Sequence, residues 1–449
     1  MDKLPVEVWQ LVFSNLSTPD LVPVCRLNRA ANRIAQESLY SDIELKWTPL
    51  GPPVQIVPLI QKLARRPDLA SRVRSLILTG SRPCRHLQGG VITIPEDHYQ
   101  ELIDVIMPFG AGYSTDWITG LMHGRLDAFV AVLLAQLPNM VTLELTYQFA
   151  RDIDFLCRLF CYRYTHAMLK DAPVLFSRLT HVNFQPYLGN HSPWSSGNMY
   201  EASCFFYLPA VQHLETEMLG PHQFSWPLLE LPDPINLRSL KLIISRKGFT
   251  RRILQRTTNL QSLDWVLPTI IDESHVAVVL QHLDLQTVGL NLHPVADSLT
   301  SLNLDIGGYH GLSYYFSTIY QTIALKELNL RPLSQLRTIE APLAFLIGLS
   351  PDDLLTPLHE RLPPSLEHLT LKDTFGNTNC IEWQSKDEFS VFENWWTSLE
   401  LYTPRFISFR LQLDWAKEKW LLEERLALQE LGTEHGIKVT VQKIYEDVV

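Results

Sequence analysis

The 449-residue sequence predicts an α/β protein: a helical N-terminal domain, then a solenoid whose short parallel strands line the concave face and whose helices lie outside. Three observations predict this fold. Apolar residues recur at helical spacing over the first forty residues, and farther on the pattern apolar-x-x-apolar-x-apolar recurs along the chain. Helix-like stretches precede several copies of that pattern. Helix, turn and strand in repetition are typical of a solenoid.

The first helix is expected to begin near Pro5, because a proline lacks the N–H that would have no partner in a first helical turn. Its apolar residues form two rows at four-residue spacing, the first being Val8, Val12 and Leu16 and the second Trp9 and Phe13. Two rows on so short a helix are more than one small hydrophobic face needs. We therefore expect one row to close a small core and the other to meet a partner.

A second helix is expected after Ser17-Thr18-Pro19-Asp20, which combines a hydroxyl cap, an early proline and an acid in the first turn. Apolar residues then continue with helical periodicity from Leu21 to Leu39. Pro23 interrupts this run and is expected to kink or delay the helix, since proline removes a backbone donor.

Roughly residues 3–43 resemble an F-box, which is a motif of three helices. The resemblance rests on Leu4-Pro5-x-Glu7-Val8-Trp9, on the step from Leu16 to Asp20-Leu21, on Val24-Cys25-Arg26 and on Leu39-Tyr40. F-box proteins are substrate receptors of cullin-based ubiquitin ligases, joined to the cullin through a Skp-type adaptor. The resemblance implies an adaptor-facing set consisting of Leu4, Pro5, Val8, Leu16, Leu21 and Val24. The alternative is a helical hairpin that caps the downstream domain.

Composition favours an intracellular interaction protein. Hydrophobic residues make up 46% and charged residues 19%, which excludes disorder of the whole chain. The net charge is −10 and no run of five basic residues occurs, so we expect neither nucleic acid nor a membrane surface as partner. No apolar stretch reaches the roughly 18 residues of a membrane helix. The six cysteines are thinly spread, as free thiols in a reducing compartment would be. We expect a cytoplasmic or nuclear location, or both.

The repeated pattern predicts a strand at each copy, because its last three positions alternate between apolar and polar. The central apolar residues are Leu76, Leu143, Val182, Leu214, Leu240, Leu263, Leu302, Leu328, Ile339, Leu369 and Phe409. Helices are expected at 57–66, 126–137, 152–164, 249–257, 275–283 and 352–362. Leu328 and Ile339 are too close for a full repeat, so one of these two segments should not be a ladder strand. The series resembles an irregular leucine-rich-repeat array over roughly 70–412, of the kind attached to F-boxes in large fungal families. An unrelated α/β domain is the alternative.

The predicted domains are an F-box at 1–45, a linker with the first helix of the array at 46–70, the repeat domain at 71–412, and a C-terminal cap at 413–449. Three prolines within 48–53 suggest a stiff spacer behind the F-box. Residues 81–93, 188–199 and 375–390 are expected to be loops or insertions. A helix at 415–431 and a strand at 437–444 would cover the end of the array. The helix could instead be a free amphipathic helix for a partner.

Side chains between the apolar strand positions should project from the concave face. Such positions are polar on any exposed sheet face, so polarity alone does not separate a binding surface from solvated protein. As a set they favour a polar or basic protein segment over an apolar helix. Trp194, Trp226, Trp265, Trp383, Trp395 and Trp396 are possible anchors, although core packing is the simpler interpretation for most of them. The candidate substrate contacts are Glu144, His181, His213, Glu215, Lys241, Asp264, Glu327, His368 and Arg410.

Catalytic motifs are poor, and we expect no enzyme activity, no cofactor and no metal. Cys157 and Cys161 share a helix face near His166, but no second cysteine pair completes a zinc site. The segment from Gly307 to Gly311 lacks the lysine of a phosphate loop. The expected function is substrate recognition in an F-box-type ligase, with the Skp-type adaptor, a cullin and an unknown protein substrate as partners. The alternatives are an F-box scaffold outside degradation and a repeat-containing hydrolase or transferase.

Overall fold

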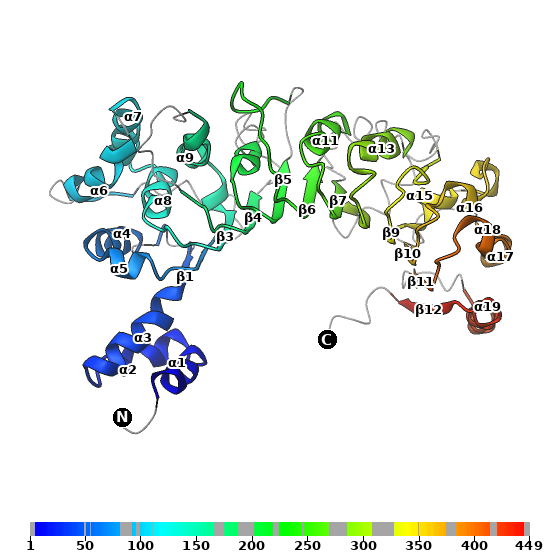
Figure 1. Cartoon of the computed structure of the whole chain (residues 1–449), viewed down its shortest axis with the longest axis horizontal. Coiled ribbons are helices and arrows are strands. Elements are labelled where there is room, and N and C mark those ends of the chain that lie inside the picture. Colours follow the sequence, from blue (N-terminus) through cyan, green and yellow to red (C-terminus); the bar gives the residue numbers. More distant parts are fainter. Residues whose placement is uncertain are drawn as a thin grey trace. The chain divides into compact units, whose positions relative to one another are not determined.

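The structure, a computed structural model, divides into two compact units, Met1–Asn236 and Leu237–Val449. Figure 1 labels their helices and strands. The residues that it describes are 5–48, 51–53, 55–80, 92–95, 99–109, 111–165, 175–186, 202–218, 224–244, 247–268, 285–307, 327–348, 350–373, 383–413 and 420–443.

The first unit opens with three helices, α1 (Val6–Ser14), α2 (Thr18–Val24) and α3 (Arg29–Ser41). The predicted start of α2 is confirmed, but Ser17 makes no side-chain capping hydrogen bond to the helix backbone; its hydroxyl instead donates a hydrogen bond of 2.5 Å to the Asp20 carboxylate. Pro23 lies inside α2, which ends one residue later. Asn28 then caps α3, its side-chain oxygen accepting from the Ala31 N–H at 2.8 Å. The expected kink is thus a complete break between two helices.

Five parallel strands follow in the first unit, each paired with the next along the chain. Parallel neighbours need a crossover connection, and helices supply it here. Four of these strands are the predicted ones, while β1 is additional. The strands are β1 (Asp42–Lys46), β2 (Ser75–Thr79), β3 (Thr142–Tyr147), β4 (His181–Pro186) and β5 (His213–Met218).

The proline-containing segment does not separate the N-terminal helices from the strands as expected, because α3 runs directly into β1, which pairs with β2. The proline-containing segment lies after β1, where Thr48 and Gly51 form an antiparallel bridge ahead of α4 (Ile56–Arg65). Glu37 of α3 also forms an ion pair of 3.1 Å with Arg72, and α3 packs against α5 (Pro67–Ala70). The three N-terminal helices are therefore joined to the strand layer by continuous secondary structure.

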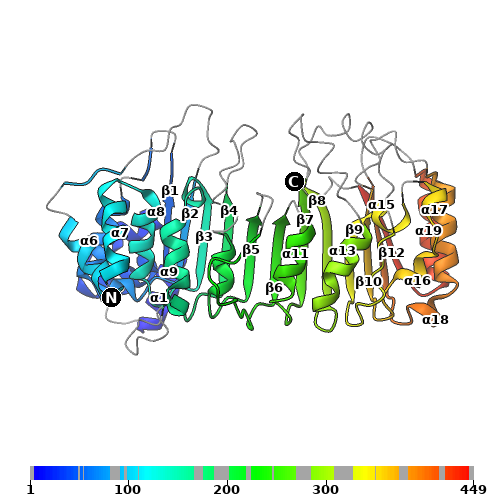
Figure 2. The same ribbon diagram turned by 90° about the horizontal axis from the view of Figure 1, so that it is seen from above.

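Helices of the first unit cover one face of its strands (Figures 1 and 2). The predicted helices at 57–66, 126–137 and 152–164 are confirmed, each within a few residues. The others were not predicted, and residues 81–91 and 188–199 lie outside the described residues. Besides α4 and α5, the elements are α6 (Tyr99–Ile106), η2 (Met107–Phe109), α7 (Ala111–Met122), α8 (Leu126–Ala135), η3 (Gln148–Ala150), α9 (Asp154–Thr165) and η4 (Ser203–Tyr207).

The second unit repeats this plan with parallel strands paired in chain order. Residues 327–330 form no strand, and β9 pairs directly with β8. This confirms that only one of the two closely spaced segments belongs to the ladder. The strands are β6 (Ser239–Ile244), β7 (Ser262–Pro268), β8 (Ser301–Gly307), β9 (Thr338–Pro342), β10 (His368–Lys372), β11 (Ser408–Leu413) and β12 (Lys438–Lys443).

Helices of the second unit agree with the sequence only in part. The helix near 249–257 is confirmed, the one at 275–283 lies outside the described residues, and 352–362 contains only two short turns. The insertion expected at 375–390 is wrong from Ser385 onward, where α17 begins. The helices are α11 (Lys247–Leu254), α13 (Leu285–Leu292), η5 (His293–Val295), α15 (Leu343–Ile347), η6 (Pro351–Asp353), α16 (Leu358–Arg361), α17 (Ser385–Trp396), α18 (Leu399–Tyr402) and α19 (Leu422–Glu434).

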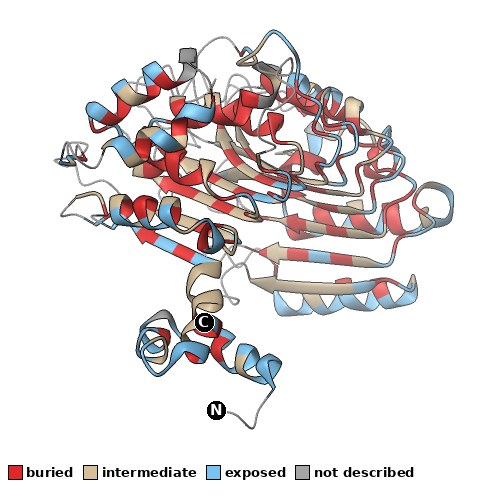
Figure 3. Cartoon of the chain, turned by 60° about the vertical axis from the view of Figure 1, so that its left-hand side comes forward, coloured by how far each residue is buried: buried red, intermediate tan, exposed pale blue. Residues whose placement is uncertain are grey.

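The C-terminal helix and strand occupy the place expected of a cap. β12 pairs in parallel with β11, and α19 packs against β12. In the core of each unit, the inward side chains of the strands lie against the helices. In β3, for example, Leu143 and Leu145 are completely buried while Thr142 and Glu144 are half-buried. This alternation along the strands is visible in Figure 3 and fits a repeat solenoid of parallel strands.

Candidate functional site

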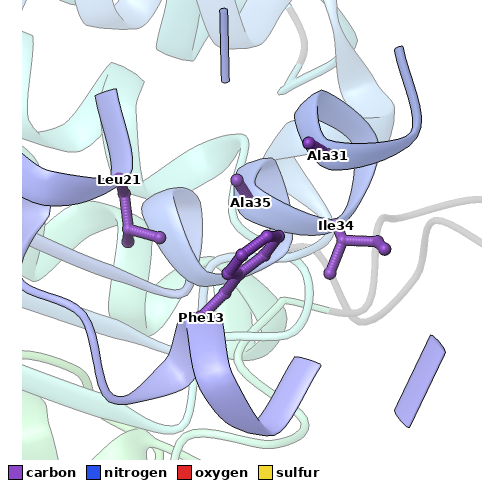
Figure 4. Packing of buried hydrophobic residues seen from close by; sticks show 5 residues of the cluster. All are labelled: Phe13, Leu21, Ala31, Ile34 and Ala35. Carbon is purple, nitrogen blue, oxygen red and sulfur yellow. The ribbon is translucent and has the colours of Figure 1, made fainter. Parts of the chain in front are cut away.

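One apolar row of α1 closes a small core inside the N-terminal domain. Phe13 is 2% exposed and packs with Leu21 of α2 and with Ile34 and Ala35 of α3. The Trp9 ring packs against the Phe13 ring, with 5.5 Å between the ring centroids. Figure 4 shows the Phe13 ring pointing toward the α3 side chains. The Trp9 and Phe13 row is therefore used internally.

The other row of α1 is open to solvent. Val8 is 38% exposed and Val12 44%, and two neighbours on the same helix, Val6 and Leu11, are 51% and 67% exposed. Val8, Leu11 and Val12 lie within about 100° of one another around the helix axis, and we call these three residues the α1 strip; Val6 lies on the side of Phe13. The prediction of two uses holds for Phe13 in the core and for Val8 and Val12 at the surface, whereas Leu16, the third member of the second row, packs against the small core. Val6 and Leu11 were missed because they lie outside the four-residue rows. Contiguous exposed apolar side chains of this kind mark interaction sites.

The six predicted adaptor contacts differ in position. Pro5 is exposed directly before α1, and Val8 belongs to the α1 strip. Leu16 and Val24 are partly buried against the small core, and Leu21 is only 3% exposed within it. A partner meeting this state of the chain would find no free face on Leu21, so we leave Leu21 out of the candidate surface. Leu4 lies outside the described residues.

The three helices, the small core and the α1 strip lie in a segment with a recognisable relative. Residues 1–46 match the F-box-like family model. The chain thus carries an F-box-like domain, which indicates a role in protein–protein interaction. F-box domains typically bind Skp-type adaptors, which supports an adaptor as the kind of partner. No curated protein matches the chain.

Truncating Phe13 should unfold the F-box-like domain. Removing a buried phenylalanine side chain costs about 3–5 kcal/mol, and a core this small has few neighbours to fill the cavity. We expect Phe13→Ala to lower the unfolding midpoint of the domain and to make α1 sensitive to proteolysis. Leu11→Ala, at a largely exposed position of the same helix, should change the free energy of unfolding by less than about 0.5 kcal/mol. Equal effects of the two substitutions would contradict the assignment of the two rows.

The outward face of the first unit's strands brings four predicted substrate contacts together. His181 of β4 is aligned with His213 of β5. Glu144 of β3 and Glu215 of β5 lie in one row, with Asn183 of β4 between them. The rings of His181 and His213 stack at 4.4 Å between centroids. Burial and, next, the charge of His213 lower the pKa of His181. His181 is therefore biased toward the neutral form, in which its ring can bind a polar partner group.

Carboxylates dominate the rest of this face. Glu215 accepts a hydrogen bond of 3.0 Å from the Gln185 amide, and Lys46 pairs with Glu44 at 2.9 Å. Glu217 of β5 is half-buried, and burial raises its pKa to about 7. Among the residues that the structure describes, no cation pairs with Glu217. Sequence reasoning missed Glu217 because the repeat pattern covers only the first part of each strand.

The outward face of the second unit is largely neutralised within itself. Lys372 of β10 contacts Asp305 of β8 at 3.2 Å and Glu340 of β9 at 2.5 Å. The ion pairs outweigh burial, so the pKa of Lys372 is raised. Asp264 accepts a hydrogen bond of 3.1 Å from Asn303.

The remaining predicted substrate contacts of the second unit differ in burial and in hydrogen bonding. The His368 Nδ1 atom and the Ser408 hydroxyl share a hydrogen bond of 2.8 Å. Lys241 is half-buried in β6, and Arg410 is exposed in β11. The prediction for Glu327 is wrong, because this residue lies outside every strand and its carboxylate accepts from the Thr356 N–H at 2.6 Å.

The tryptophans considered as anchors serve the core wherever the structure describes them. Trp226 is half-buried among Phe224, Phe206 and Tyr207, and Trp194 lies outside the described residues. The buried ones are Trp265, Trp383, Trp395 and Trp396.

No three or more His, Cys, Asp or Glu side chains in the described part of the chain are arranged to hold a metal ion. No helix in that part of the chain is long and apolar enough to cross a membrane.

Proposed function

We propose that this protein is a non-catalytic substrate receptor of a Skp–cullin–F-box ubiquitin ligase. The α1 strip of the F-box-like domain binds the Skp-type adaptor and through it a cullin, while the outward strand faces recruit a protein substrate. The observation that carries the proposal is the exposed α1 strip, which lies inside the segment that matches the F-box-like family.

The chain contributes to ubiquitin transfer by position. A receptor that holds a substrate lysine near an activated thioester raises the effective concentration of the two reactants. This requires a fixed offset between adaptor and substrate. The direct passage of α3 into β1, together with the ion pair between Glu37 and Arg72, supports such rigidity in the first unit.

The first unit's strand face fits a basic substrate segment. Glu144 lies on β3, and Glu215 and Glu217 lie on β5, with β4 between these strands. An arginine or lysine placed beside Glu217 would offset the burial that disfavours its charged form. The second unit's face already pairs Lys372 with two carboxylates. Charge complementarity therefore favours the first unit for basic segments.

Two measurements test the proposal. Purified full-length protein mixed with a purified Skp-type adaptor should elute as one complex in size-exclusion chromatography, and separate elution would overturn it. In cells, captured partners should accumulate when the adaptor-binding surface is mutated. Unchanged partner levels, with adaptor binding intact in the unmutated protein, would instead support a scaffold outside degradation.

A further inference from the structure

Three cysteines gather at one place in the helix layer of the first unit. Cys157 and Cys161 lie one turn apart on α9, and Cys204 lies in η4, which packs against α9. Cys161 is 2% exposed and Cys204 is fully buried, whereas Cys157 is half-buried and thus reachable from solvent. All three are reduced in this structure. The sequence places only Cys157 and Cys161 near each other, because Cys204 is more than forty residues farther along the chain.

The cluster divides into one reactive thiol and two protected thiols. Hydrogen bonds from Cys161 and then from Cys204 lower the pKa of the Cys157 thiol to about 5, against the effect of burial. Cys157 also lies at the end of the first turn of α9, where the Asp154 carboxylate raises the pKa of the thiol and the Arg158 guanidinium lowers it. The hydrogen bond with Cys157 and burial raise the pKa of Cys161. Cys157 is therefore the nucleophile of the group.

Helix geometry selects the partner of Cys157. A disulfide needs Cβ atoms about 3.5–4.5 Å apart, whereas residues four apart on a helix have Cβ atoms about 5–6 Å apart. Joining Cys157 to Cys161 would thus distort α9. Cys204 lies on a separate element, hydrogen-bonded to the same sulfur, and is not bound by the spacing of that helix.

We propose that Cys157 and Cys204 form a peroxide-responsive dithiol. The Cys157 thiolate attacks one oxygen of hydrogen peroxide, so an S–O bond forms, the O–O bond breaks, and hydroxide leaves. The Cys204 thiol then attacks the sulfenic acid sulfur, so the S–S bond forms and water leaves with the thiol proton. The two sulfurs lose two electrons and peroxide is reduced to water.

The disulfide would tie together the segments that lead into β4 and β5. These strands carry His181 and His213, so oxidation would stiffen the part of the unit beneath the stacked pair. Because the bond closes the chain between residues 157 and 204, it should restrict the unfolded chain and raise the unfolding midpoint. This inference does not depend on adaptor or substrate binding.

Tryptic mapping of the full-length protein tests the pairing directly. Arg158 separates Cys157 from Cys161, so trypsin places Cys157 in peptide 152–158, Cys161 in 159–163 and Cys204 in 179–238. After brief treatment with hydrogen peroxide and alkylation, we expect peptide 152–158 joined to 179–238, and its release by dithiothreitol. A link from 152–158 to 159–163, or no link at all in the folded protein, would overturn the proposal.

Cys25 is the matched control, since it is also half-buried but its pKa is raised by burial. Between pH 6 and 8 the iodoacetamide reaction of Cys25 should speed up by about 100-fold, whereas that of Cys157 should change less than about twofold, because its thiolate is already formed. In Cys204→Ser, Cys157 should be trapped by dimedone as the sulfenic acid. Parallel pH profiles of Cys25 and Cys157 in the unmutated protein would contradict the assignment of the nucleophile.

Discussion

Replacing Val8 and Val12 together by aspartate should abolish binding of the Skp-type adaptor. Each valine loses about 1.5–3 kcal/mol of apolar burial in the complex, and each new carboxylate would be desolvated without a partner. We expect a loss of at least about 4 kcal/mol, roughly a thousandfold in Kd. The two side chains are 38% and 44% exposed in the free chain, so the fold should persist. Isothermal titration with purified adaptor measures the loss.

The matched control is Met122→Asp, because Met122 is 67% exposed on α7, outside the F-box-like domain. This variant should bind the adaptor with unchanged affinity. Circular dichroism and the unfolding midpoint should match the unmutated protein in both variants. Full affinity of the Val8→Asp/Val12→Asp protein, with the fold intact, would exclude the α1 strip as the docking surface.

Replacing Glu217 by glutamine should stabilise the first unit at pH 8. The pKa of Glu217 is raised from 4.5 to about 7 by burial, so between these values the folded state keeps a proton that the unfolded chain has lost. The free energy of unfolding therefore falls as pH rises through this window. Above pH 7 the folded state bears the full cost of the buried Glu217 charge. A shift of this size corresponds to about 3 kcal/mol, which partial exposure reduces to about 1–2 kcal/mol.

Thermal unfolding at several pH values checks this prediction. Glu217→Gln should raise the midpoint at pH 8 by roughly 3–6 °C, and the gain should vanish below pH 4.5. Glu215→Gln removes a carboxylate two residues away that accepts a hydrogen bond from Gln185, so it should give no such gain. A stability gain that is equal at pH 4 and pH 8 would show that burial of the Glu217 charge is not its source.

The same substitution connects stability with recognition. If a basic substrate segment binds beside Glu217, its cation should favour the ionised carboxylate, and binding should release a proton near neutral pH. Glu217→Gln should then weaken a basic peptide substrate while leaving the adaptor complex unchanged. Loss of both interactions would indicate damage to the fold.

Sequence periodicity was sufficient for the strands and for the two uses of α1. Each repeat has three apolar positions to bury, and a strand that follows a turn buries all three on one side. Each described strand from β2 to β11 therefore lies where the pattern predicts it. The four-residue spacing of Phe13 and Trp9 beside Val8 and Val12 likewise required two faces. Pattern reasoning missed β1 although Tyr40, Ile43 and Leu45 have the repeat spacing, because Leu39-Tyr40 was assigned to the end of the F-box.

By itself the sequence determined the repeat plan, the start of α2 and the surplus of apolar surface on α1, because each depends on local spacing and backbone chemistry. Only the tertiary structure decided that Leu21 is buried and that the Glu327 carboxylate accepts a hydrogen bond from the Thr356 N–H. It also decided that Lys372 pairs with two carboxylates and that Cys204 lies beside the α9 cysteines. Those outcomes depend on which distant segments pack together. Burial and pairing energies act across strands and helices that no local pattern brings into contact.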